Sequence, residues 1–182
     1  MKVKFSKTMD RFLEDCCGVR ESYQKKFEQK LIKILQRKIK INSKYRLKSR
    51  KTKTGQRIWY TQESYRCFRN GFRWAKKIDF TDKLQLMEYE FDGNEVWIEN
   101  TKGIKHCLKK AINAYIQLLY QMNEQDASFI TFFMLVPLEG DKGKGKWEVE
   151  IRFYEDRLFD ENKDTLWGDI DNLGNPIILV CI

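Results

Sequence analysis

The 182-residue chain has only two prolines, a single histidine and an odd number of cysteines, five. None of the cysteines forms a C-x-x-C pair, which argues against a disulfide framework or a zinc ribbon and favours a reducing compartment. Ribonuclease chemistry by a histidine pair is excluded because it needs two histidines. Any phosphodiester cleavage would need Lys, Arg, Tyr, a carboxylate or a metal ion instead.

Long hydrophobic segments are missing as well. The longest apolar run, Phe129 to Leu138, is about half of what a bilayer-spanning helix requires. The first residues, Met-Lys-Val-Lys-Phe-Ser-Lys, contain no apolar signal-peptide core. We therefore expect a soluble, cytoplasmic protein with no membrane partner.

Acidic residues are scarce in the first part of the chain. Residues 1–77 contain 24 Lys and Arg but 6 Asp and Glu, a net charge of +18, whereas residues 78–182 contain 11 and 20, a net charge of −9. Residues 20–57 hold fifteen basic side chains and only two acidic ones. Such density repels itself unless a polyanion neutralises it. It therefore favours nucleic-acid binding over an ordinary solvated surface, which mixes both signs.

Hydrophobic periodicity predicts an α+β fold, an antiparallel sheet packed by helices. Within one compact domain, we expect a basic helical segment at 1–77 and an α+β body at 78–182. Helices are predicted at 8–17 (capped by Thr8), 20–37, 62–77 and 101–124 (capped by Thr101). Strands are predicted in pairs at 44–50 with 56–61, 84–91 with 95–99, and 129–138 with 147–154, and singly at 177–182.

The basic N-terminal helix and a protruding β-hairpin at 44–61 make up the predicted binding surface. Strict alternation predicts that Lys44, Arg46, Lys48 and Arg50 project together from one face of a strand. Trp59 and Tyr60 could stack on an unpaired base. The candidate nucleic-acid-binding residues are Lys44, Arg46, Lys48, Arg50, Lys51, Lys53, Arg57, Trp59, Tyr60, Arg66, Arg69 and Arg73.

Cofactor motifs fail on inspection. The segment 140–146 matches most of a phosphate loop, but Trp147 stands where a Ser or Thr should hold magnesium. A classical calcium loop at 169–180 is excluded, because Leu173 and Val180 occupy ligand positions. We expect no cofactor; a divalent ion near Asp169 and Asp171, shared with Asp164, is the weaker alternative. No catalytic residue can be named, and His106 is expected to be structural or exposed.

A small, lysine-rich chain with a basic hairpin at Lys44–Thr61 and no familiar catalytic motif resembles the anti-CRISPR inhibitors encoded by phages and mobile elements of Gram-positive bacteria. Inhibitors of the type II single-protein effector are the nearest in style. The resemblance implies that the partners are the effector nuclease and its guide RNA, inside a bacterial host cell. The hairpin would contact the guide RNA, and acidic residues would meet basic protein surface: Glu148, Glu150, Asp156 and Asp160.

Two modes of inhibition remain open. The protein could block guide loading or target binding sterically, or it could promote guide-RNA cleavage, a ribonuclease-like activity that needs the effector complex. In the second mode hairpin cations would stabilise the developing phosphorane charge: Lys48, Arg50, Lys51, Lys53 or Arg57. Blocking is favoured because no general base can be identified. The alternatives from other classes are a plasmid or phage DNA-binding accessory protein and a small standalone ribonuclease.

Overall fold

A five-stranded antiparallel sheet forms the centre of the molecule. The structure, a computed structural model, describes residues 1–17, 23–64, 82–99, 101–137, 147–158 and 170–182. The strands lie in the order β1 (Lys2–Phe5), β7 (Ile177–Cys181), β5 (Phe129–Pro137), β6 (Trp147–Glu155) and β4 (Val96–Ile98). A separate two-stranded sheet is made of β2 (Leu47–Lys51) and β3 (Arg57–Thr61). The described helices include none with the length and apolar character needed to cross a bilayer.

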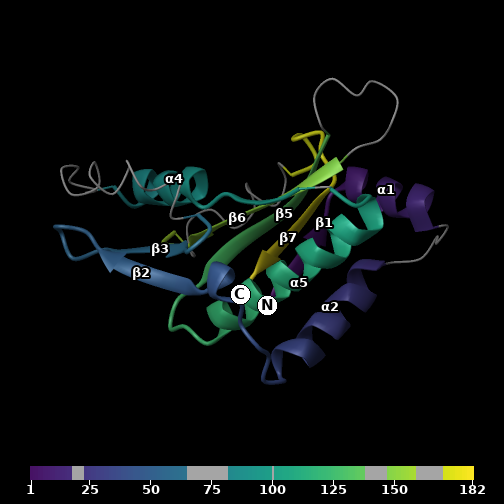
Figure 1. Cartoon of the computed structure of the whole chain (residues 1–182). Helices are drawn as coiled ribbons and strands as arrows, with labels where there is room; N and C mark the ends of the chain where they lie inside the picture. The colour runs from purple at the N-terminus through teal and green to yellow at the C-terminus, as the bar shows by residue number, and fades with distance from the viewer. Residues whose placement is uncertain (18–22, 65–81, 100, 138–146, 159–169) are drawn as a thin grey trace.

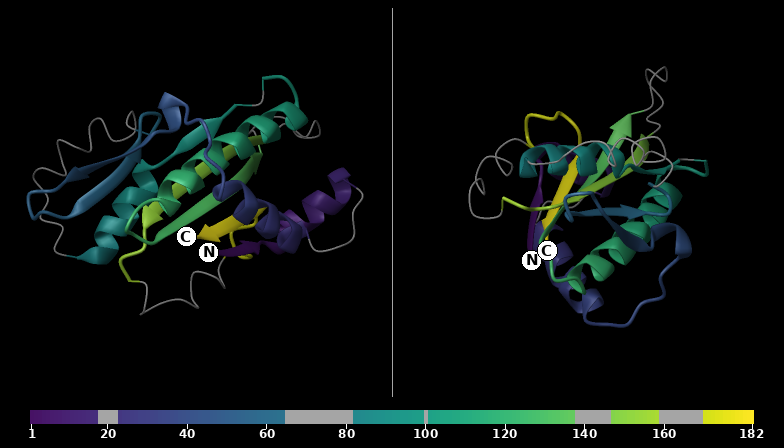
Figure 2. Two further views of the ribbon diagram at one scale, coloured as in Figure 1. Left: turned by 90° about the horizontal axis from the view of Figure 1, so that it is seen from below. Right: turned by 90° about the vertical axis from the view of Figure 1, so that its left-hand side faces the viewer.

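Helices cover both faces of the large sheet (Figures 1 and 2). On one face α1 (Lys7–Cys17), α2 (Tyr23–Leu35) and α5 (Ile104–Asn123) pack over the main core. On the other face α4 (Lys83–Gly93) covers a smaller core through Met87 and Phe91. The α+β class and the antiparallel sheet predicted from the sequence are therefore confirmed.

The strands of the large sheet confirm the apolar-run predictions. Along β5 and β6, alternate side chains enter the two cores, so nearly every residue of β5 is buried. This is why β5 reads as a continuous apolar run rather than as an alternating strand. The predicted pairing of 129–138 with 147–154 and the last strand at 177–182 are both observed.

The predicted hairpin of 84–91 with 95–99 is wrong. Residues 83–93 form α4, whose first turn is capped by Asp82 Oδ1 accepting a hydrogen bond from the Leu84 amide at 2.8 Å. Leu86, Met87 and Glu90 are buried at helical spacing, a pattern that the alternating letters of 84–91 obscure. Only residues 96–98 form a strand, β4. The Asp-Gly-Asn sequence ends the helix instead of making a hairpin turn.

Helix starts differ from the predicted caps. Ser6, not Thr8, caps α1, because its hydroxyl accepts a hydrogen bond from the Met9 amide at 3.1 Å. Gly103, not Thr101, precedes α5; its φ of 91° lies in the region that favours glycine. The predicted helix at 20–37 is observed over Tyr23–Leu35, whereas nearly all of the one at 62–77 falls outside the described residues.

A short first strand, β1, was not predicted. It pairs antiparallel with β7, so that Lys2 lies opposite Cys181, and both ends of the chain lie side by side (Figure 1). Val3 and Phe5 of β1 enter the main core together with residues of α5 and β5. The basic segment and the acidic body are therefore not separate units in space, because the first segment supplies a strand of the body's sheet.

Candidate nucleic-acid interface

The predicted hairpin at 44–61 is confirmed, and its two strands have different surroundings. In β2 all residues from Lys48 onward are exposed. In β3 the neighbouring residues Ile58 and Trp59 are 2% and 4% exposed. Because neighbours in a strand point to opposite faces, β3 is buried on both faces at this point. β2 is thus the outer strand of the hairpin, and β3 joins it to the body.

The alternation of cations along 44–50 holds only within β2. Lys44 lies in a 3₁₀ turn, Ser43–Tyr45, and Arg46 follows that turn, so neither belongs to the strand. Lys48 and Arg50 lie opposite Tyr60 and Ile58 in the register and share their face.

The other face of β2 carries Lys51, which lies opposite Arg57. The predicted single row of four cations is therefore wrong. Cations project from both faces of β2, and Lys44 additionally pairs with Glu63 at 3.8 Å.

The turn between the strands lies at the far end of the hairpin (Figure 1) and carries one further cation, Lys53. The Thr52 amide donates to the Gln56 carbonyl at 2.8 Å, and the Gly55 amide donates to the Thr52 carbonyl at 3.1 Å. Gly55 has a φ of 83°, the left-handed conformation that closes such hairpin loops. Lys53 is exposed on this turn beside Lys51. The turn is thus locally defined and holds Lys53 in solvent.

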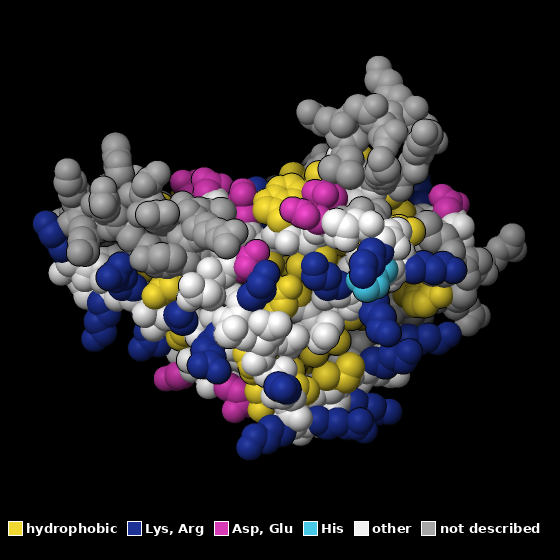
Figure 3. All heavy atoms as spheres, in the orientation of Figure 1, with side chains coloured by type: hydrophobic (Ala, Val, Ile, Leu, Met, Phe, Trp, Pro, Cys, Tyr) yellow, Lys and Arg dark blue, Asp and Glu magenta, His cyan; other side chains and the backbone are white. Residues whose placement is uncertain are grey.

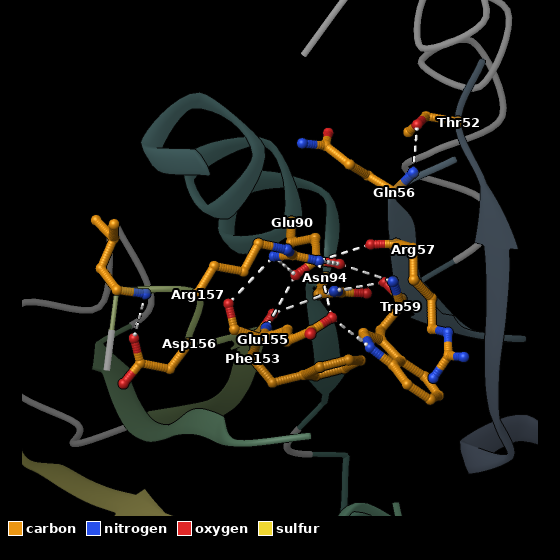
Figure 4. A network of polar contacts seen from close by, with 11 residues as sticks. Thr52, Gln56, Arg57, Trp59, Glu90, Asn94, Phe153, Glu155, Asp156 and Arg157 are labelled. Atoms are coloured by element: carbon orange, nitrogen blue, oxygen red, sulfur yellow. Dashed lines mark hydrogen bonds and ion pairs between the residues drawn. The ribbon is translucent and has the colours of Figure 1, made fainter. Parts of the chain in front are cut away.

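A buried carboxylate on α4 holds β3 to the body (Figure 4). Glu90 is fully buried, and its two oxygens accept hydrogen bonds from the Trp59 amide at 2.7 Å and the Glu155 amide at 2.9 Å. The Arg157 guanidinium donates to both oxygens, at 2.8 and 2.9 Å. Burial raises the pKa of Glu90 above its usual range, while the Arg157 guanidinium and the two amides oppose that rise.

Asn94 lies one helical turn after Glu90. Its side-chain amide both accepts and donates hydrogen bonds, whereas the Glu90 carboxylate only accepts them. Its side-chain Nδ2 donates to the Trp59 carbonyl at 2.9 Å and to the Phe153 carbonyl at 3.1 Å. Glu90 and Asn94 therefore satisfy both backbone groups of Trp59, as a neighbouring strand would. The same two side chains bond to β6, so α4 joins the small sheet to the large one.

The start of the hairpin is fastened to α5. Gln121 accepts from the Leu47 amide at 2.9 Å and donates to the Tyr45 carbonyl at 2.8 Å. Gln117 accepts from the Asn42 amide at 2.7 Å, and the Tyr45 ring is buried in the main core. The segment between α2 and β2 consequently has a fixed path over α5.

Trp59 does not fit the predicted role of a base-stacking platform. Its ring packs edge-on against Phe129 with centroids 5.3 Å apart, and its Nε1 donates to Glu155 at 2.8 Å. With 4% exposure it offers almost no ring surface to a ligand. Tyr60 is half-buried opposite Lys48, and the Arg57 guanidinium lies 5.1 Å from the centre of the Trp59 ring. Trp59 is an anchor of the hairpin, and the predicted Arg66, Arg69 and Arg73 lie outside the described residues.

Exposed cations extend well beyond the hairpin (Figure 3). The view shows Lys and Arg side chains around the single histidine, His106 of α5, and down over α2. α5 contacts α2, the 3₁₀ turn and β2, so these elements adjoin. We define the basic surface as the exposed cations of α2, of the segment 36–46, of the hairpin and of the start of α5: Lys25, Lys26, Lys30, Lys33, Arg37, Lys38, Lys40, Lys44, Arg46, Lys48, Arg50, Lys51, Lys53, Arg57, Lys102, Lys105, Lys109 and Lys110.

The four lysines at the start of α5 were missed, because they belong to a sequence half whose net charge is negative. Their spacing could have revealed them, since Lys102, Lys105 and Lys109 recur every three or four residues.

No family model, no curated protein and no solved structure matches this chain. Its function must therefore be inferred from its own surface.

Acidic side chains gather elsewhere, in part as buried ion pairs. Arg152 of β6 bonds to Glu150 and Glu95 and lies 3.6 Å from Asp92. Burial raises the pKa of Glu150, and Arg152 opposes that rise. Figure 3 shows acidic side chains along the upper edge of the molecule and others at its lower left. Of the acidic residues expected to meet protein, Glu150 is thus mostly buried, and Asp160 lies outside the described residues.

The described residues give little support to a metal site or to a reactive thiol. Asp171 accepts a hydrogen bond from the Lys7 amide at 2.7 Å, while Asp164 and Asp169 lie outside the described ranges. Across those ranges no group of three His, Cys, Asp or Glu side chains could hold a metal ion. Burial raises the pKa of the Cys181 thiol to about 12, which disfavours the nucleophilic thiolate.

Proposed function

We propose that this protein binds the phosphate backbone of a nucleic acid through its basic surface. The observation that carries the proposal is the spread of exposed cations over four adjoining elements, while several of the body's carboxylates are buried in ion pairs. The field of a cation in a buried ion pair is compensated by its carboxylate, whereas a cluster of exposed cations with few acidic neighbours presents a net positive field to a partner. A polyanion fits this arrangement better than a neutral or basic partner.

The resemblance to anti-CRISPR inhibitors directs the proposal to one target, the guide RNA of a type II effector complex in the cytoplasm of a bacterial host. In such a complex the exposed guide-RNA backbone would meet the basic surface. Exposed acidic side chains of the body, such as Asp92, would face the positively charged nucleic-acid channel of the effector. We propose a steric mode of inhibition, because it requires only charged surface and no catalytic group.

The decisive experiment incubates the protein with the purified effector and end-labelled guide RNA, and analyses each sample on native and denaturing gels. We expect a shifted complex on the native gel, intact guide RNA on the denaturing gel, and loss of target cleavage. Parallel samples contain the RNA without effector, and duplex DNA without effector. If guide-RNA fragments appear only when the effector is present, the mode of inhibition is cleavage of the guide RNA and not steric blocking.

Other outcomes of the same gels identify the alternatives. Degradation of RNA without effector indicates a standalone ribonuclease, and a shift of duplex DNA alone indicates a DNA-binding accessory protein. A salt series adds a second criterion. If about six to ten phosphates are contacted, RNA affinity should fall by roughly 10³- to 10⁵-fold between about 50 and 200 mM salt. A flat response would overturn the proposal of backbone binding.

A further inference from the structure

A groove of about 450 Å³ lies between the ends of α2 and α5, beside Met1, which precedes β1. It is where the chain leaves α2 and begins the segment that leads to the hairpin. The groove therefore borders the basic surface, to which Arg37 and Lys38 belong. Its lining residues are Met1, Ile32, Leu35, Gln36, Arg37, Lys38, Tyr120, Asn123 and Glu124.

The lining combines apolar surface with two side-chain amides. Ile32 and Met1 are each 42% exposed, Leu35 belongs to the main core, and Tyr120 packs against that core. Gln36 and Asn123 are exposed on the two helix ends that border the groove. A concave site that combines apolar side chains with polar groups is typical of organic ligands, and this groove adds charged side chains to that combination.

The charges around the groove are unequally placed. Arg37 and Lys38 are exposed, and neither makes an ion pair with any residue in the described part of the chain. Both begin the segment whose later cations lead to β2. Glu124 is the only acidic lining residue and belongs to the end of α5. A phosphate group is therefore favoured at the α2 side of the groove and disfavoured at the α5 side.

We propose that this groove holds an unstacked nucleobase of single-stranded RNA, with the attached phosphates on Arg37 and Lys38. The proposal rests on the proposed function and specifies its ligand. The base would lie on Ile32 and Tyr120, and the amides of Gln36 and Asn123 would reach its hydrogen-bonding edge. Recognition of RNA through splayed bases and apolar or aromatic side chains requires an unpaired strand, because duplex bases are stacked away from such a groove.

The test compares two 12-residue ligands, oligouridylate and an abasic ribose-phosphate oligomer that keeps every phosphate. The intact protein should bind oligouridylate about tenfold or more tightly than the abasic oligomer. The variant Gln36→Leu/Asn123→Leu, which removes both amides without changing charge, should lose most of that preference. The control Gln29→Leu/Gln85→Leu replaces exposed glutamines of α2 and α4 and should retain it.

A crosslinking measurement keeps the proposal testable if the double variant fails to fold. Oligomers containing 4-thiouridine, photolysed with the intact protein, should attach to the peptides that contain Met1, Ile32 or Tyr120. Equal affinity for the two oligomers, or crosslinks confined to the hairpin, would overturn the proposal that the groove binds a base. Either result would leave the proposal of backbone binding intact. Failure of both oligomers to bind would instead overturn the proposed function.

Discussion

The two strands of the small sheet, β2 and β3, each have five residues and pair throughout, yet they differ in almost every other respect. β3 is buried on both faces at Ile58 and Trp59. The side chains of Glu90 and Asn94, at the end of α4, bond to the backbone of Trp59 on the side away from β2. β2 has an exposed, basic surface and contacts the body mainly at its first residue. The difference teaches that β3 attaches the hairpin to the body, which leaves β2 and its cations exposed for the partner that we propose.

The largest expected effect comes from breaking the attachment of β3. Glu90→Gln should lower the free energy of unfolding by about 3–5 kcal/mol, because it breaks a buried ion pair and leaves the Arg157 guanidinium with Glu155 as its remaining carboxylate partner. Urea denaturation measures this change. Glu88→Gln, on the exposed side of the same helix, is the matched control and should change stability by less than about 0.5 kcal/mol. Equal effects of the two substitutions would show that the Glu90 network does not secure β3.

A smaller effect, in binding and not in stability, is expected at the outer end of the hairpin. Lys51→Glu/Lys53→Glu should weaken RNA binding by about tenfold or more and should reduce the salt slope by about 2, since each lysine accounts for about one phosphate contact. The midpoint of thermal unfolding of this variant should stay within a few degrees of that of the unaltered protein, because both side chains are exposed.

The matched control for this charge reversal is Arg11→Glu/Lys83→Glu, which makes the same change in net charge outside the basic surface. It should bind RNA with nearly unchanged affinity, as measured by fluorescence anisotropy. If both pairs weaken binding equally, only the net charge matters, and β2 has no special part in recognition.

The smallest effect is expected at Trp59. The sequence predicted that this residue stacks on a base, whereas in the structure its ring attaches the hairpin to the body. Trp59→Phe keeps an aromatic ring beside Phe129 but removes the Nε1 hydrogen bond to Glu155. We expect a loss of about 1 kcal/mol in stability and no change in RNA affinity. A fall in affinity with unchanged stability would restore Trp59 as a base-stacking residue.

The sequence predicted those elements whose signal is local. The apolar run at 129–138 and the turn signals around Gly55 led to the correct strands, because strand propensity and turn chemistry act over a few residues. α4 was misread because buried Glu90 interrupts its apolar face, and β1 was missed because four residues carry too little periodicity.

Of the candidate site, the sequence could predict the positive charge but not the contacts that position it. The density of cations at 20–57 pointed to the hairpin and α2, and the structure exposes most of these side chains. Sequence could not show that Glu90 and Asn94 would bind Trp59, since that network joins residues about thirty positions apart through side-chain-to-backbone bonds. Nor could it show that α5 would pack against α2.

The pairing of β1 with β7 also has a consequence for the order in which the chain folds. Ser6 and Ile177 are 171 positions apart, yet the Ser6 hydroxyl accepts a hydrogen bond from the Ile177 amide at 2.9 Å. During synthesis Val3 and Phe5 therefore emerge from the ribosome long before the strand that will pair with β1. Contacts of such long separation are closed late, at a high entropic cost. We expect β1 to join the sheet as one of the last steps of folding, after β5 and β6 have paired.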